Sequence, residues 1–134
     1  MTLADMKAHV MFQTNNDAED VGDYLPSLLS YLNDGYDRLV KARTKSHLPQ
    51  EEYPWLSEDT DEPNLPEWLH VYICDWATWL VYRNGNPQKQ NRGRAYYETF
   101  MMILSKISDE GGLNGIDPET GMNIQYKNFR NIPR

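Results

Sequence analysis

Apolar residues recur every three to four positions along most of the chain, and this spacing predicts helices. Between residues 2 and 13 the apolar stripe consists of Leu3, Met6 and Val10. Between residues 25 and 45 it is longer and consists of Leu25, Leu28, Leu29, Leu32, Tyr36, Leu39 and Val40. Between residues 87 and 109 it consists of Tyr96, Phe100, Ile103, Leu104 and Ile107. Each stripe is typical of an amphipathic helix that packs one face against a core.

A further helix is predicted over residues 66–84, with both ends marked. Pro66 suits a first helical turn, Gly85 suits a stop, and Asn86 with Pro87 starts the next helix. This helix is apolar on nearly all sides, through Trp68, Leu69, Val71, Tyr72, Ile73, Trp76, Ala77, Trp79, Leu80 and Val81. It must be covered all round, by other helices of the chain or by other subunits. The predicted fold is mainly α, a small four-helix bundle with a C-terminal β-hairpin or extended tail.

The polar side of the segment 25–45 carries charges at helical spacing. Asp34 and Arg38, and Asp37 and Lys41, stand four residues apart, which favours ion pairs on a helix surface. Gly35 lies between them, although glycine costs about 1 kcal/mol relative to alanine inside a helix. We therefore expect another part of the chain to approach closely at Gly35.

The connection over residues 47–65 is long and acidic, and it contains no basic residue after His47. Its carboxylates are Glu51, Glu52, Glu58, Asp59, Asp61 and Glu62, and the name acidic loop is used below for residues 51–62. A long loop in a compact domain is usually functional or ordered by a partner. Tyr53 and Trp55 either attach it to its own core or meet that partner.

Positive charge gathers where the third helix ends and the fourth begins. The residues of this basic patch are Arg83, Lys89, Arg92 and Arg94. Cations near a helix N-terminus oppose the helix dipole, so a compensating acidic surface is expected. The acidic loop provides one, either from a neighbouring copy of the chain or from the same chain.

After Gly112 the helical period ends, which divides the chain into a helical bundle domain, residues 1–112, and an arm, residues 113–134. Pro118 and Gly121 predict a turn between strands at residues 113–116 and 122–126. The end of this docking arm mixes aromatic, aliphatic and basic side chains, Tyr126, Lys127, Phe129, Arg130 and Ile132. Such a composition suits insertion into a partner.

Length and charge narrow the possible functions. The 134 residues fit one domain, and the net charge of −7 is unfavourable for sequence-specific DNA binding. Cys74 is the only cysteine, which fits the reducing cytoplasm rather than a disulfide framework. Asp75 would lie in mid-bilayer if the apolar helix crossed a membrane, so we expect no membrane association.

Motifs for catalysis or cofactors are missing from the sequence, which contains no glycine-rich phosphate loop, CxxC or HExxH. His70 and Cys74 share a helix face, but two ligands are too few for a metal site, and a nucleophile–base pair on one helix would have poor geometry. Asp75 is a carboxylate in an apolar helix, and a hydrogen bond from Thr78 or Tyr97, or an ion pair with Arg83 or Arg94, would account for it. We therefore predict no catalytic, cofactor or metal site.

Three phrases of the chain resemble the head–tail connector, or adaptor, proteins of tailed bacteriophages. They are LPSLLSYLNDGYDRLVKAR at residues 25–43, LPEWLHVYICDWATWLVYRNGNPQKQ at residues 65–90 and RGRAYYETFMMIL at residues 92–104. The shared pattern is an Asn/Gly-Tyr-x-x-Leu motif within residues 33–39, an acidic loop, a Leu-Pro-x-Trp helix start and an aromatic-x-x-Phe helix face. The resemblance covers residues 1–110 and leaves the docking arm unmatched.

The resemblance implies a structural protein of the virion, made in the host cytoplasm and placed at the head–tail interface. It implies a homo-oligomeric ring of twelve copies that binds the portal protein through the C-terminal arm and joins it to a tail-side connector or tail protein. Double-stranded DNA would pass through the ring without sequence-specific binding. The alternative function is a small soluble helical binding or regulatory module that forms no ring.

Overall fold

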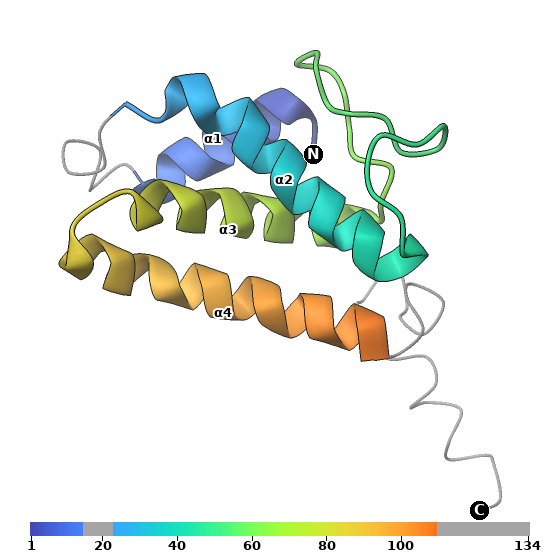
Figure 1. The fold of residues 1–134 in the computed structure, drawn as a ribbon. Coiled ribbons are helices and arrows are strands. Elements are labelled where there is room, and N and C mark those ends of the chain that lie inside the picture. The colour runs from blue at the N-terminus through green and yellow to red at the C-terminus, as the bar shows by residue number, and fades with distance from the viewer. Residues whose placement is uncertain (15–22, 110–134) are drawn as a thin grey trace, which may run out of the picture.

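The computed structural model describes residues 1–14 and 23–109, and the regular secondary structure within them is all α-helical (Figure 1). The helices are α1 (Leu3–Thr14), α2 (Leu25–Thr44), α3 (Glu67–Arg83) and α4 (Pro87–Asp109). The predicted mainly α fold and its helix positions are confirmed for this part of the chain. The expected strands and docking arm at residues 113–134 lie outside the described residues.

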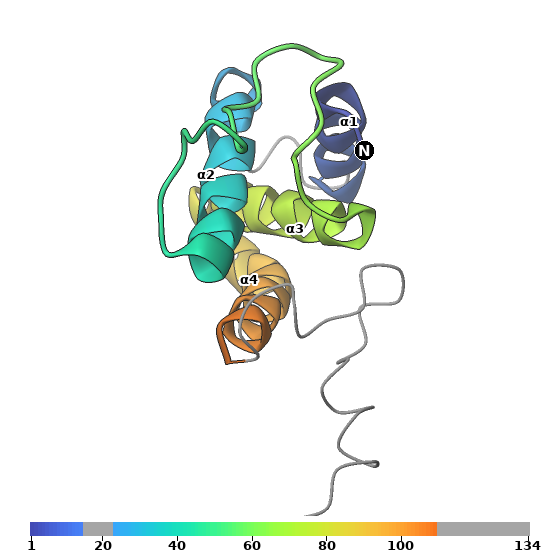
Figure 2. The ribbon, with the colours of Figure 1, turned by 90° about the vertical axis from the view of Figure 1, so that its right-hand side faces the viewer.

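The apolar helix α3 is the centre of the fold. α1 and α2 lie on one side of it and α4 lies on the other, so that α3 contacts all three (Figures 1 and 2). Its buried side chains include Leu69, Ile73, Cys74, Trp76, Ala77, Leu80 and Val81. Trp68, Tyr72 and Trp79 are partly buried against the same core. Of the two ways to cover this helix, other helices of the same chain therefore do most of the covering.

Local hydrogen bonds explain where the helices begin and end. The Asp5 backbone N–H donates to Thr2 Oγ1 at 3.2 Å, and the Thr2 N–H donates to Asp5 Oδ2 at 3.1 Å, which is a reciprocal capping box at the start of α1. Asn86 Oδ1 accepts the Lys89 N–H at 3.0 Å and caps α4. At the end of α2, Lys45 takes a left-handed conformation with φ 67°.

The acidic loop lies against the helices through two of its apolar side chains. Tyr53 and Leu56 are buried, and Asn33 of α2 bonds both the N–H and the carbonyl of Leu56 at 2.9 Å. The hydroxyl of Tyr53 also accepts a hydrogen bond from Arg43. Trp55 differs, since 46% of it is exposed. The loop is thus attached to its own core, and Trp55 remains accessible.

Two glycines allow close packing between helices. A Cβ on Gly35 would lie 3.2 Å from Trp76 Cβ and 3.3 Å from the Ile73 carbonyl oxygen, which confirms the close approach expected there. At Gly93 the approach is tighter, because a Cβ would lie 2.5 Å from Tyr82 Cβ. Gly93 therefore sets the distance between α3 and α4.

The described helices include none that combines the length and the apolar character required of a membrane span.

Gly93→Ala is expected to lower the free energy of unfolding by about 1 kcal/mol. Overpacking costs about 1–3 kcal/mol, and the better helix propensity of alanine offsets about 1 kcal/mol of this. Asn91→Ala, at an exposed position on α4, is the control and is expected to stabilise by about 0.5 kcal/mol. Urea unfolding measures both values. Equal stabilisation by the two variants would contradict the proposed close contact.

Candidate interaction surfaces

Several carboxylates of the acidic loop act within the chain. Asp61 Oδ2 accepts the backbone N–H groups of Ser57 and Glu58 at 2.9 Å, and these bonds hold the pKa of Asp61 below its usual value. Asp59 pairs with Lys7 at 3.3 Å.

The exposed carboxylates that remain are Glu51, Glu52 and Glu58. The loop therefore presents an ordered, negatively charged surface beside Trp55.

The N-terminal ammonium of Met1 lies in a cluster of groups that can bind a cation. It lies 2.5 Å from Glu67 Oε1, 3.3 Å from Glu62 Oε1 and 2.9 Å from His70 Nδ1. His70 Nε2 is 2.9 Å from the Leu65 carbonyl, which fixes the proton on Nε2 and leaves Nδ1 as the acceptor. Burial opposes the ammonium charge, but the hydrogen bonds and charges of Glu67 and Glu62 outweigh it and raise the pKa of the amine.

Glu62, Glu67 and His70 form the group of potential metal ligands in the described part of the chain, with ligand atoms within 4.8 Å of one another. Sequence spacing links His70 to Cys74, whereas the structure places His70 beside two glutamates. Glu62 lies in the acidic loop before α3, and Glu67 is the first residue of α3. Because the Met1 ammonium lies among these groups, the cluster acts as an anchor for the start of α1.

The thiol of Cys74 is unsuited to nucleophilic chemistry. It is fully buried, and its Sγ lies 3.8 Å from the Met6 carbonyl. Burial raises its pKa to about 12, so the thiolate does not form near neutral pH.

Asp75 has a structural partner, as expected, but from a different helix than predicted. Gln13 of α1 donates from Nε2 to Asp75 Oδ1 at 3.2 Å, and its Oε1 accepts a hydrogen bond from Thr78 at 2.5 Å. The predicted direct partners are therefore wrong for Asp75, and Thr78 acts through Gln13. Burial raises the pKa of Asp75, although the Gln13 bond opposes that rise.

The basic patch is smaller than predicted. Lys89 is buried, whereas Arg83, Arg92 and Arg94 are exposed. Among the ion pairs of the described residues, none joins the acidic loop to Arg83 or Arg94. These two arginines therefore do not form the intrachain pairing considered above. Pairing with a neighbouring copy stays a prediction.

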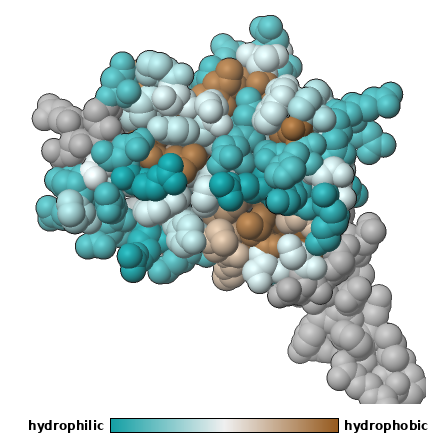
Figure 3. Space-filling model, viewed as in Figure 1, coloured by the Kyte–Doolittle hydropathy of each residue, from teal (hydrophilic) through white to brown (hydrophobic). Residues whose placement is uncertain are grey.

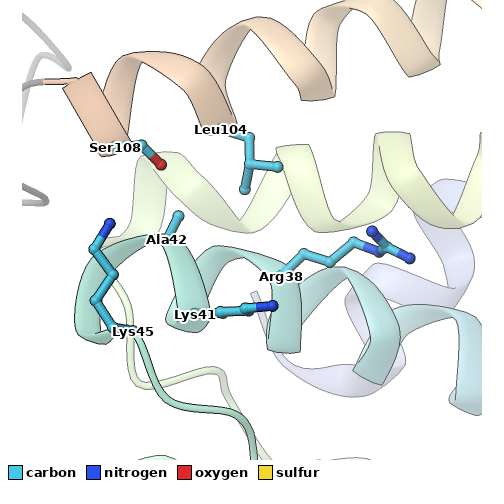
Figure 4. A pocket seen from close by; sticks show the side chains of 6 residues that line it. All are labelled: Arg38, Lys41, Ala42, Lys45, Leu104 and Ser108. Carbon is cyan, nitrogen blue, oxygen red and sulfur yellow. The ribbon is translucent and has the colours of Figure 1, made fainter.

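A groove between α2 and α4 combines an apolar floor with a basic rim (Figure 4). Its volume is about 520 Å³, and its lining residues are Arg38, Lys41, Ala42, Lys45, Leu104 and Ser108. Residue spacing does not predict this groove, because its two sides come from helices about 60 positions apart.

The charges on α2 differ partly from the expected pairs. Arg38 Nε pairs with Asp34 Oδ2 at 3.0 Å, as predicted. The predicted pair of Asp37 with Lys41 is wrong, because the Asp37 carboxylate accepts the Leu48 N–H at 2.7 Å and lies 3.0 Å from His47 Nδ1. Within residues 1–14 and 23–109, no ion pair includes Lys41 or Lys45.

Hydrophobic patches also remain on a mostly hydrophilic surface (Figure 3). In the part of the chain that the structure describes, the large exposed apolar side chains are Met11, Phe12, Leu25, Trp55, Tyr97, Met101 and Met102. Phe12 is the extreme case, with 81% exposed. Exposed apolar side chains among charged ones are typical of surfaces that contact other proteins.

Comparison with known proteins gives no relative: no family model, no curated protein and no solved structure matches the chain. The functional interpretation therefore depends on these surfaces and on the sequence resemblance described above.

Glu67→Gln is expected to lower the free energy of unfolding by about 1 kcal/mol near pH 6. It removes an ion pair worth about 0.2–1 kcal/mol and a favourable charge at the start of α3 worth about 0.3–1 kcal/mol. Urea unfolding of Glu67→Gln and of Glu58→Gln, an exposed control in the same loop, provides the measurement.

The stability difference between wild type and Glu67→Gln depends on pH through two pKa shifts. The hydrogen bond from the N-terminus lowers the pKa of Glu67, so its contribution is present above the unfolded pKa and is lost as pH falls through the folded pKa. The pKa of the Met1 amine is raised, so its contribution disappears as pH rises through the folded pKa. A difference in free energy of unfolding between wild type and Glu67→Gln that stays constant from pH 3 to pH 10 would contradict the role of the Met1 cluster as an anchor.

Asp75→Asn tests the buried carboxyl. Because burial raises the folded pKa of Asp75, the wild-type protein loses stability as pH rises from the unfolded pKa through the folded pKa. Asparagine keeps an oxygen that accepts the Gln13 bond and carries no charge. The variant should therefore gain stability relative to wild type between pH 3.5 and pH 7 in urea unfolding. A difference in free energy of unfolding between wild type and Asp75→Asn that stays constant over this pH range would refute the effect of burial on the Asp75 carboxyl.

Proposed function

We propose that this chain is a structural head–tail connector of a tailed phage, a ring subunit that joins the portal to tail components. The sequence phrases that resemble that family form nearly all of α2, all of α3, the turn between α3 and α4, and most of α4. In this proposal the ring binds the portal on one side and a tail-side connector or tail protein on the other. The protein would act in the virion after synthesis in the host cytoplasm.

The observation that carries the proposal is the separation of opposite charges on one folded chain. The acidic loop projects Glu51, Glu52 and Glu58, while basic side chains are exposed on other faces of the helices. Glu51, Glu52 and Glu58, and the basic Arg83, Arg94, Lys41 and Lys45, take part in none of the ion pairs of the described residues, which favours head-to-tail contacts between copies. Repetition of a head-to-tail contact produces a ring when the rotation between copies closes.

The overall charge fits a channel that lets DNA pass. A net charge of −7 makes the surface repel a phosphate backbone on average, so DNA would pass without being held. The proposed role requires no catalysis and no cofactor.

One observation favours the alternative, a helical binding module that forms no ring. α3 has its core-facing side chains covered by α1, α2 and α4 of the same chain, so folding does not require other copies. A monomeric module would use exposed side chains such as Phe12 and Met102 to bind a partner.

Electron microscopy of the chain mixed with the portal ring of its phage separates the two functions. A connector is expected to add a ring of density beneath the portal, with symmetry matching that of the portal or related to it. A monomer that leaves the portal unchanged would reject the connector function and favour the binding module.

The docking arm is expected to provide portal affinity without contributing to the helical fold. A chain truncated after Gly112 should keep its helical circular dichroism signal and lose at least about tenfold in portal affinity, measured by surface plasmon resonance. Phe129→Ala in the full chain should weaken binding in the same direction, and Asn91→Ala, at an exposed polar position on α4, is the control. Normal docking by the truncated chain would remove the arm from the proposal.

A further inference from the structure

We propose that the groove between α2 and α4 receives the acidic loop of a second copy of this chain. In this contact Glu51 and Glu52 face Lys41 and Lys45, and Trp55 lies over the apolar floor. The proposal rests on the ring assembly described above and names the surfaces through which neighbouring copies would meet.

The groove has the chemistry of a site for an acidic segment with an apolar anchor. Ala42 and Leu104 supply the apolar floor, and Lys41 and Lys45 stand on its rim (Figure 4). Lys41 is available because Asp37, the acid four residues before it, is bonded to Leu48 and His47 instead. The groove volume of about 520 Å³ is in the range that accommodates a large side chain with its neighbours.

Arg38 adds a second kind of contact at the groove. Its guanidinium lies 4.5 Å from the ring centroid of Trp76 and pairs with Asp34, so its position is fixed. A guanidinium held in this way is suited to bind a further carboxylate or an aromatic edge with little additional loss of side-chain entropy.

The acidic loop has the complementary features. Glu51 and Glu52 are exposed, and Trp55 keeps 46% of its surface accessible although it lies beside α2. Tyr53 and Leu56 hold the loop on the body of the protein, so it is ordered before it meets a partner. Tryptophan and arginine are the residues that most often dominate binding energy at protein interfaces.

Both surfaces can be used at once by each copy. Trp55 lies beside Ser30, Asn33, Asp34 and Asp37, whereas the groove uses Arg38, Lys41, Ala42 and Lys45, a neighbouring face of the same helix. A copy that binds one neighbour through its groove therefore still offers its loop to another. This makes the contact heterologous and repeatable, as a ring requires.

The groove is favoured over the basic patch as the partner of the acidic loop. Lys89 of that patch is buried, which leaves arginines dispersed over the α3–α4 turn and the first turns of α4. The groove instead places two lysines that take part in none of the described ion pairs next to an apolar floor.

Charge reversal provides a direct test, with self-association of the full chain measured by sedimentation equilibrium at low salt. Lys41→Glu/Lys45→Glu makes both surfaces acidic, and Glu51→Lys/Glu52→Lys makes both basic. Each double variant alone should lose at least about tenfold in association, because like charges then meet. An equimolar mixture of the two should recover association, since each groove then meets a loop of opposite charge.

The controls identify the surface. Arg83→Glu/Arg94→Glu reverses two exposed charges outside the groove and should leave association within about twofold of wild type. Trp55→Ala should weaken association without loss of helicity in circular dichroism. The proposal is overturned if wild type stays monomeric at several hundred micromolar, if the mixture fails to associate, or if the Arg83/Arg94 variant loses association instead.

Portal binding is measured separately, so the two proposals fail in different ways. Self-association that depends on the groove, combined with no affinity for a portal ring, would reject the connector function and keep this contact. Portal rings decorated equally by wild type and by Lys41→Glu/Lys45→Glu would keep the connector function and reject this contact.

Discussion

The need to cover α3 determines the arrangement of the rest of the molecule. This helix is apolar on nearly every side, and burial of such surface is the main favourable term in folding. α1 and α2 cover one side and α4 covers the other (Figures 1 and 2). Gly93 and Gly35 let the neighbouring helices approach closely enough to pack against Tyr82 and Trp76. Because the chain satisfies this constraint by itself, its remaining exposed groups are available for contacts with other molecules.

The sequence predicts features that depend on nearby residues well. Helix positions follow from the spacing of apolar residues, and the cap at Asn86 follows from a short side chain that bonds the backbone N–H three residues further on. The pair of Asp34 with Arg38 is also local, since both residues lie on one helical face.

Features that depend on contacts between distant segments were not predictable in the same way. The partner of Asp75 is Gln13, 62 positions away, and the partner of Asp37 is the backbone at Leu48, beyond the end of the helix. The cluster around the Met1 ammonium joins the start of the chain to the start of α3. Spacing along one helix carries no information on such contacts. The groove between α2 and α4 was missed for the same reason.

Side chains that bond partners within the chain change which charges are available for the proposed assembly. An acid that bonds backbone N–H groups, such as Asp61, no longer contributes to a docking surface, and a lysine whose expected partner is occupied, such as Lys41, becomes available. The structure thereby separates charges that stabilise the fold from charges that face outward. Folding of one chain then depends mainly on apolar burial, whereas association between chains also requires charge complementarity.

The separation of the forces that drive folding from those that drive association is tested most directly by sedimentation velocity and circular dichroism at low salt and at 1 M salt. At 1 M salt the screening length falls to about 3 Å, which weakens contacts between exposed charges and leaves apolar burial intact. The account predicts assemblies at low salt and fully helical monomers at high salt. Assemblies that survive 1 M salt, or a loss of helicity when they dissociate, would contradict it, because α3 would then depend on other copies for its cover.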